Sequence, residues 1–254
     1  MFLDTPERWK KLLAVLEKES VIGLDSEFEG VDFSSGQSCV NLAKIDVFSV
    51  AVLTSKWHPR GYHEAKGCVL PKEAIPYFKD VLENPKILKA AHNSNVDVHA
   101  FYNAGVDCQG VVNTLSLARW IRPGRLLYNL DDLCYDYLGV GKADSFKDIF
   151  VIDDIQMVNK PKKVKVCLCG VEKCRKRTYP EHHKWEELRD NFVEKKVGTK
   201  TIPLHTVRPG HELWERYVKY ALVDAIRAVE LYDFLVRLGE RIEVDIPWYK
   251  NEPK

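Results

Sequence analysis

The chain has 254 residues, of which 45% are hydrophobic and 30% are charged, and its formal net charge is +1. This is the composition of an ordinary globular protein, and the small net charge excludes a strong overall field, so any contact with nucleic acid must come from a local basic patch. No apolar run is long enough to cross a membrane, and the first residues lack the apolar core of a secretory signal. We therefore expect a cytoplasmic protein, in the host cytoplasm if it is viral, with no membrane partner.

Short apolar segments alternate with segments of helical periodicity along the chain. Thr5 and Pro6 are typical of a helix start, and Trp9, Leu12 and Leu16 follow at helical spacing. Strands are expected at 21–25, 46–54 and 86–93, and further helices at 71–84, 96–105, 113–121, 128–140 and 212–237. Strands near the start with helices interleaved throughout indicate an α/β sheet with helices on both faces.

The segment from about 151 to 210 departs from this pattern, because its helical periodicity fades. Between Lys160 and Arg177 it holds eight Lys or Arg residues and a single Glu. We interpret it as a basic insertion, placed before the last helix of a single domain that spans residues 1–254.

Four acidic residues are predicted to meet at one edge of the sheet. Asp25 and Glu27 are two residues apart at the end of a strand, so their side chains point to the same face. Asp97 falls in the first turn of a helix directly after a strand, and Asp224 comes from the last helix. Such carboxylates would repel one another without cations between them, and their oxygen atoms suit Mg²⁺ or Mn²⁺. Two such ions about 4 Å apart can activate a water and stabilise the leaving oxygen of a phosphodiester.

Tyr220 precedes Asp224 by one helical turn, so its hydroxyl group points the same way as that carboxylate. Each feature alone has a simpler interpretation, because a D-x-E sequence after a strand is most often a solvated strand end. The order, spacing and placement of all the features together favour a site over isolated surface charges.

The sequences DSE, NSNVD and YALVD, in this order, resemble the D-x-E, N-x-x-x-D and Y-x-x-x-D motifs of the DEDD 3′–5′ exonucleases. The tyrosine is that of the DEDDy branch, and the chain looks most like the proofreading domain of family A DNA polymerases. The resemblance covers about 21–150 and 212–238 and excludes the basic insertion. It implies a ribonuclease H-like mixed sheet flanked by helices. It also implies hydrolysis at single-stranded or frayed DNA 3′ ends that releases nucleoside 5′-monophosphates, beside a fused or separate DNA polymerase.

The resemblance assigns catalytic roles position by position. Asp25, Glu27 and Asp224 would hold the metal ion that activates the attacking water. Asp25 and Asp97 would hold a second ion beside the departing 3′ oxygen. Tyr220 would orient the water, because a phenol with an ordinary pKa near 10 is a poor base at neutral pH.

The resemblance also implies contacts with the substrate. Asn93 would contact the terminal nucleotide, Phe146 would pack on a terminal base or sugar, and Val31 would wedge beside it. Phe146 and Val31 are equally compatible with a place in the core. The family often has Asp-Thr where this chain has Asn113 and Thr114, which puts the local geometry there in question.

Seven cysteines in a chain of this size do not suggest a disulfide framework. Four of them lie among apolar segments and are expected to be buried thiols of a reducing compartment: Cys39, Cys68, Cys108 and Cys134. The other three cluster with two histidines in the insertion and form a candidate structural Zn²⁺ site: Cys167, Cys169, Cys174 and either His182 or His183. A basic loop with incidental cysteines is the alternative.

A zinc clip would hold a set of basic side chains as a rigid patch for the phosphate backbone of single-stranded DNA. This set consists of Lys173, Arg175, Lys176 and Arg177. The leading prediction for the whole chain is thus an exodeoxyribonuclease. An RNase D-like exoribonuclease and a non-catalytic nucleic-acid-binding module are the alternatives, although such modules typically lose a metal carboxylate and all four are present here.

Overall fold

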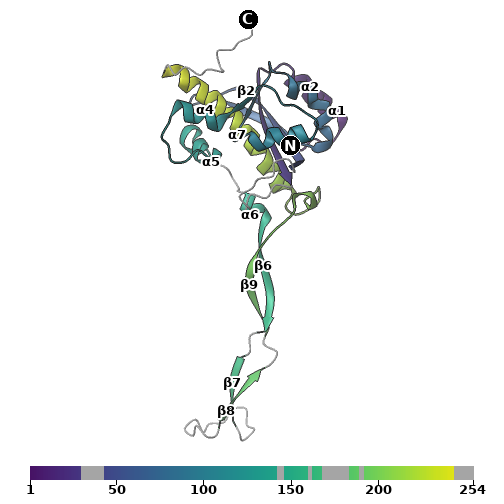
Figure 1. Cartoon of the computed structure of the whole chain (residues 1–254), viewed down its shortest axis with the longest axis vertical. Helices are drawn as coiled ribbons and strands as arrows, with labels where there is room; N and C mark the ends of the chain where they lie inside the picture. The colour runs from purple at the N-terminus through teal and green to yellow at the C-terminus, as the bar shows by residue number, and fades with distance from the viewer. Residues whose placement is uncertain (30–42, 142–145, 160–161, 168–182, 189–191, 243–254) are drawn as a thin grey trace. The chain divides into compact units, whose positions relative to one another are not determined.

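The structure is a computed structural model and describes residues 1–29, 43–141, 146–159, 162–167, 183–188 and 192–242 (Figure 1). Five of these stretches are described by their backbone alone: 146–147, 157–159, 162–167, 183–188 and 192–193. The chain divides into two compact units. The first unit comprises Met1–Phe150 and Pro203–Lys254, and the second unit comprises Val151–Ile202.

A mixed five-stranded sheet forms the centre of the first unit. Its strands are β1 (Val21–Glu29), β2 (Lys44–His58), β3 (Tyr62–Pro71), β4 (Leu88–Ala91) and β5 (Val111–Asn113), in the order β3-β2-β1-β4-β5. β2 is antiparallel to β1 and β3, whereas β1, β4 and β5 are parallel. The carboxyl ends of the three parallel strands therefore lie at the same edge of the sheet.

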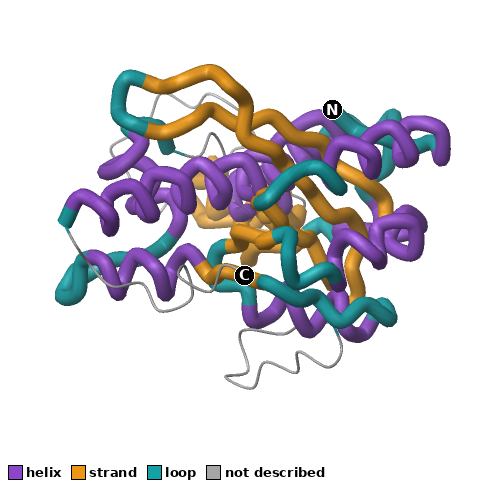
Figure 2. Tube along the Cα trace, turned by 90° about the horizontal axis from the view of Figure 1, so that it is seen from above, coloured by secondary structure: helices purple, strands orange, loops and turns teal. Residues whose placement is uncertain are grey.

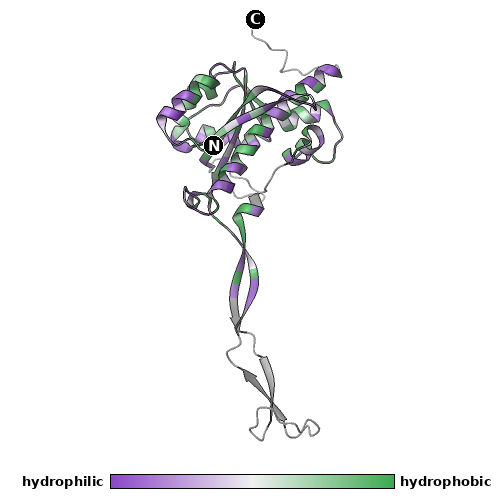
Figure 3. Ribbon diagram, turned by 180° about the vertical axis from the view of Figure 1, so that it is seen from behind, coloured by the Kyte–Doolittle hydropathy of each residue, from purple (hydrophilic) through white to green (hydrophobic). Residues whose placement is uncertain are grey.

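Helices cover both faces of this sheet (Figure 2). They are α1 (Pro6–Leu16), α2 (Ile75–Glu83), α3 (Asn95–Asn103), α4 (Thr114–Ile121), α5 (Leu130–Leu133), α6 (Phe146–Phe150) and α7 (Trp214–Arg241). A π-helix (Cys134–Leu138) and two 3-10 turns (Lys72–Ala74 and Leu204–Thr206) complete the unit. The longer helices carry apolar residues on one side and polar residues on the other, which is why they pack on a sheet (Figure 3).

Two apolar clusters lie on the two faces of the sheet. Ile22 and Leu24 of β1 belong to the cluster beneath α1, α2 and α3, where the ring of Phe48 meets those of Phe78 and Phe101 edge to face at 5.9 and 5.7 Å. The other cluster joins α4, α5, the π-helix and α7, with Leu133 and Leu235 fully buried. β1 is thus packed on both sides, as a central strand must be.

The second unit consists of two antiparallel pairs of strands. β6 (Val151–Asn159) pairs with β9 (Phe192–Thr201), and β7 (Lys162–Cys167) pairs with β8 (His183–Leu188). The sequence predicted neither pair, because neither shows the regular alternation of a half-buried strand. Whether the two units form one domain with an insertion stays a prediction.

The mixed sheet flanked by helices confirms the predicted fold class. β3 and β5 were not predicted, and the segment 71–84, whose composition suits an exposed helix, instead forms α2 with Phe78 and Leu82 buried. The described cysteines of the first unit, Cys68, Cys108 and Cys134, are buried thiols as expected, and Cys39 lies outside the described residues. In the part of the chain with described coordinates, no helix combines the length and apolar character that crossing a membrane requires.

Candidate active site

β1 presents the first two carboxylates. Gly23 of this strand meets α7 so closely that an added Cβ would lie 2.1 Å from the carbonyl oxygen of Ala225. Side chains alternate along a strand, so Gly23, Asp25 and Glu27 share the face toward α7, while Ser26 shares the opposite face with Leu24. Asp25 is half-buried and Glu27 is buried.

Asp97 reaches β1 from the helix layer on the other face. It lies in the first turn of α3, as the sequence predicted, and it is buried. The backbone N–H and the Oγ of Ser26 both donate to its Oδ1, at 3.0 and 2.6 Å. Ser26, the residue between the two acids of the strand, thus fixes the third acid beside them.

α7 supplies Tyr220 and Asp224. Burial raises the pKa of the Tyr220 hydroxyl, and the charges of Glu27, Asp224 and Asp25 raise it further. The hydroxyl therefore stays protonated at any physiological pH and acts as a hydrogen-bond donor. These shared charges place the tyrosine in the same electrostatic environment as three of the predicted carboxylates.

Asp97 and Asp224 also influence each other. Burial raises the pKa of Asp97 to about 6, and the nearby Asp224 charge adds to the increase, whereas the hydrogen bonds from Ser26 lower it. Asp224 is itself buried. The structure therefore brings carboxylates from β1, α3 and α7 to one edge of the sheet, where the charge of Asp224 disfavours ionisation of Asp97.

The donor set fits hard divalent cations, because it consists of carboxylate oxygens whose mutual repulsion such a cation would offset. Among the described residues, no group of three or more Asp, Glu, His or Cys side chains is close enough together to coordinate a metal ion as it stands. Asp25, Glu27, Asp97 and Asp224 are the residues that would hold metal ions here.

Asn93 lies at the strand end that leads into α3. It is exposed and has a positive φ of 54°, a backbone conformation that asparagine tolerates better than most residues. Its N–H donates to Oδ1 of Asn113 at 3.0 Å, and the same oxygen caps α4 by accepting from Leu115 N–H at 3.1 Å. An amide oxygen at position 113 thus supports this turn where the family often has a carboxylate.

Several predicted site residues cannot be placed with these. Val31, Cys169, Cys174, His182, Lys173, Arg175, Lys176 and Arg177 lie outside the described residues. Phe146 begins α6 and is described by its backbone only. Cys167 and His183 stand directly opposite each other where β7 pairs with β8, again as backbone positions.

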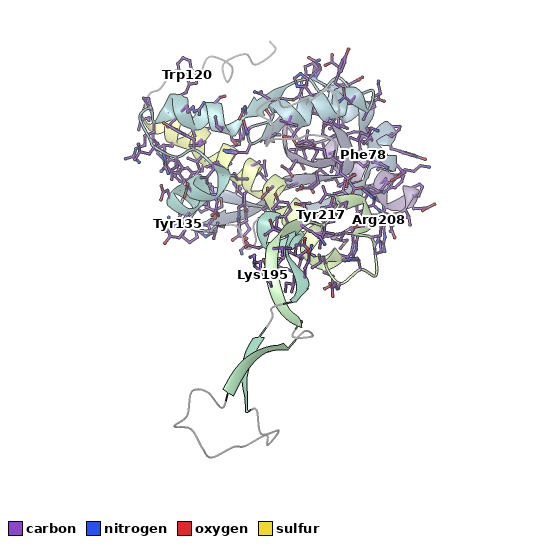
Figure 4. The ribbon with its side chains drawn as sticks, turned by 60° about the horizontal axis from the view of Figure 1, so that its bottom comes forward. Phe78, Trp120, Tyr135, Lys195, Arg208 and Tyr217 are labelled. Carbon is purple, nitrogen blue, oxygen red and sulfur yellow. The ribbon has the colours of Figure 1, made fainter. Side chains whose placement is uncertain are left out.

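Sequence reasoning missed two polar contacts near this edge. The N–H of His205 donates to Oε1 of Glu29 at 2.9 Å, and the His205 ring also contacts that carboxylate. Arg208 binds the buried Asp46 through two nitrogens at 2.9 and 2.6 Å, and the hydroxyl of Tyr217 donates to the same carboxylate at 3.0 Å (Figure 4). The partners are more than 160 residues apart in the sequence, so no local sequence pattern predicts these contacts.

Comparison with protein families matches residues 1–154 to the 3′–5′ exonuclease of the DNA polymerase A type. This match covers more than half of the chain and ends before Tyr220 and Asp224. A search of curated proteins gave no match.

Solved structures share the fold at low sequence identity. The chain is similar to Pol1 of M. smegmatis in complex with DNA primer-template and dNTP (15% identity, TM-score 0.51, covering 95% of this chain and 28% of that chain). It is also similar to Brucella melitensis NrnC bound to pGG (14% identity, TM-score 0.52, 94% and 80%). A third similar structure is Escherichia coli RNase D, an exoribonuclease involved in structured RNA processing (14% identity, TM-score 0.53, 95% and 46%).

The chain spans less than half the length of two of these three proteins, so their whole activities are not carried over to it. The sheet order, the acidic edge beside α7 and the family match agree with one another. The chain belongs to the 3′–5′ exonuclease family of the DNA polymerase A type.

Proposed function

We propose that this protein is a metal-dependent 3′–5′ exodeoxyribonuclease that removes nucleotides singly from single-stranded or frayed DNA 3′ ends as 5′-monophosphates. One observation carries the proposal: the charges of Asp25, Glu27 and Asp224 all act on the Tyr220 hydroxyl, and Ser26 of β1 fixes Asp97 where the charge of Asp224 acts on it. Mg²⁺ or Mn²⁺, as two ions, would supply an activated water and charge neutralisation at the departing oxygen.

The protein groups have separate tasks in this scheme. Asp25, Glu27 and Asp224 would hold one ion, and Asp25 with Asp97 would hold the other. Tyr220, kept protonated by its surroundings, donates a hydrogen bond that orients the attacking water. Ser26 keeps the Asp97 carboxylate aimed at the site. Asn93, whose side chain is exposed, would contact the terminal nucleotide. Phe146 would pack on the terminal base or sugar, and Val31 would wedge beside it.

An RNase D-like exoribonuclease is the second candidate. RNase D is among the similar structures. The family match to the DNA polymerase type favours DNA. A DNA polymerase, fused or separate, is the proposed partner, and the cytoplasm is the proposed location.

Matched oligonucleotides separate the two candidates. A 5′-labelled strand of one sequence, made as DNA and as RNA, is digested with Mg²⁺ and the rates are compared. We expect DNA to be degraded at least tenfold faster. Faster loss of the RNA would replace the first candidate with the second.

The second unit is proposed to hold one structural Zn²⁺. The pairing of β7 with β8 sets Cys167 opposite His183, which favours His183 over His182 as the fourth ligand beside Cys169 and Cys174. We expect one equivalent of zinc in the purified protein and its loss in a Cys167→Ser, Cys174→Ser variant. Such a variant should bind DNA more weakly, because Lys173, Arg175, Lys176 and Arg177 lose their fixed arrangement. Equal zinc content in both proteins would refute the site.

A further inference from the structure

The two units carry opposite net charges. Residues 151–202 contain 13 Lys and Arg against 8 Asp and Glu, whereas the rest of the chain contains 25 against 29. The net charge of +1 for the whole protein hides this separation. A basic unit on an acidic body is suited to a polyanion, because the body alone would repel it.

Most described residues of the β6–β9 pair are exposed, and Val151 and Asp154 are half-buried. Residues 194–200 of β9 are all exposed, and they include Lys195, Lys196 and Lys200. Lys195 is labelled in Figure 4. Ile152, Ile155 and Val197 are also exposed, by 48%, 55% and 46%. Neither core cluster of the described residues includes a side chain of the second unit. A two-stranded pair without a core is marginally stable in water, so it is poorly explained as a purely structural element.

The charges on this pair are arranged on both of its faces. Lys196 forms an ion pair with Asp153, and Lys200 pairs with Asp154 at 2.7 Å. The lysine side chains in these pairs stay 57% and 64% exposed, so their ammonium groups remain accessible to a second anion. Pairs this exposed contribute little to stability, which leaves the lysines available for another role.

The segments of the first unit that flank residues 151–202 contact elements that carry the acidic site. On the outgoing side, Arg216 of α7 donates to the carbonyl oxygen of Asp148 in α6 at 3.2 Å, and the Phe150 ring contacts that of Tyr217 at 5.2 Å. On the returning side, His205 binds Glu29, two residues beyond Glu27 on β1. Within the first unit, the segments on either side of residues 151–202 therefore contact α7 and β1, the elements that carry Asp224 and Glu27.

We infer that the second unit binds the sugar–phosphate backbone of the nucleic-acid strand whose 3′ end is being digested, through the β6–β9 lysines. This inference rests on the proposed function, which supplies the polyanion. Lysine ammonium groups interact with phosphates as point charges and do not recognise individual bases. The contact is therefore independent of the nucleotide sequence. This contact binds phosphates of nucleotides that lie outside the active site. It therefore affects only substrates that are long enough to extend beyond that site.

The test uses the full-length protein with three lysines of the second unit neutralised: Lys195→Gln, Lys196→Gln and Lys200→Gln. A matched control neutralises three exposed lysines around α1 of the first unit: Lys10→Gln, Lys11→Gln and Lys18→Gln. A third protein carries Lys195→Arg, Lys196→Arg and Lys200→Arg, and these substitutions keep the positive charges. Binding to a fluorescent 30-nucleotide single strand and to a 30-base-pair duplex is measured in EDTA over a range of salt, so that no cleavage occurs.

We expect the second-unit variant to bind the single strand about 5- to 20-fold more weakly at low salt, with a salt slope smaller by about 2, since each lysine–phosphate contact adds roughly 0.7. The control and the arginine protein should bind like the wild type. With Mg²⁺, the KM for a 30-nucleotide strand should rise while the rate on a dinucleotide stays unchanged.

An unchanged affinity and salt slope would overturn the inference, as would an equal loss in the α1 control. The inference would also be overturned if the second-unit variant bound the strand normally but no longer bound the DNA polymerase, since the lysines would then form a protein-docking surface. Because binding is measured without catalysis, strand binding without nuclease activity would refute the proposed function and leave this inference standing.

Discussion

Asp97 is a residue whose proposed role in the active site lowers the stability of the folded protein. It is buried, it is fixed by two hydrogen bonds from Ser26, and its pKa is raised to about 6. A buried carboxyl with a raised pKa disfavours the folded state once it ionises. Without metal ions, the residue therefore destabilises the protein at neutral pH.

We predict that Asp97→Asn stabilises the metal-free protein at pH 7 by about 1–2 kcal/mol while abolishing nuclease activity. Asparagine keeps an oxygen for both Ser26 donors and carries no charge. The folded state retains the Asp97 proton more tightly than the unfolded state, so the difference between the two proteins should be small near pH 4 and grow as the pH rises through 6. Urea unfolding in EDTA measures it, and a variant less stable than the wild type at pH 7 would contradict this explanation.

Tyr220 is predicted to act through its hydroxyl group alone. Tyr220→Phe should lower kcat by about 10- to 100-fold, because the attacking water loses one orienting hydrogen bond, while the affinity for Mg²⁺ and the melting temperature stay the same. The raised pKa further predicts that the pH–rate profile of the wild type shows no tyrosine ionisation up to pH 10. A variant with normal kcat would remove the tyrosine from the mechanism.

At the scale of elements, the approach of α7 to β1 determines where Asp224 lies. Gly23 permits this approach, since the carbonyl oxygen of Ala225, the residue after Asp224, occupies the space of a Cβ there. Gly23 and Asp25 share one face of β1. The close contact between strand and helix therefore positions the acids of β1 and α7 together.

Gly23→Ala should consequently reduce both stability and activity. The added methyl group must push α7 away from β1, at a cost of about 1–3 kcal/mol, and Asp224 moves with the helix. Gly198→Ala in β9 is the matched control, because a Cβ there meets nothing within 4 Å. Thermal unfolding and a nuclease assay compare the two variants. An active and stable Gly23→Ala protein would show that the spacing of α7 does not set the site.

The sequence predicted those elements whose periodicity or motif is local. The spacing of apolar residues predicts α3 and α7. The position of Asp97 in the first turn of α3 is predicted because a strand leads directly into that helix. β3 was missed because its residues Glu64 and Lys66 interrupt the apolar pattern, and in the fold Glu230 and Asp233 of α7 accept its backbone N–H groups. Ser26 was missed as a positioning residue because its partner is 71 residues away.

At the scale of the whole molecule, the two units differ in what stabilises them. The sheet of the first unit is buried beneath helices on both faces, whereas most described residues of the β6–β9 pair are exposed and none belongs to a core cluster. The opposite net charges of the units add a functional difference to this structural one.

Hydrogen exchange should reveal the difference. We predict that amide protons of β1 and β4 exchange at least a thousandfold more slowly than those of β6 and β9, because burial of apolar side chains protects only the former. Exchange followed by mass spectrometry provides the measurement. Adding a single strand in EDTA should slow exchange in β6 and β9. Strong protection there in the free protein would mean that the pair is stabilised without a ligand.

The central claim is that carboxylates from β1, α3 and α7 act as one metal-dependent centre on 3′ ends. The most direct measurement follows a 5′-labelled single strand with Mg²⁺, with EDTA, and with Asp25→Ala and Asp224→Asn variants. Our account predicts a ladder that shortens from the 3′ end only for the wild type and only with free divalent ions. Shortening in EDTA, or full activity in either variant, would contradict it.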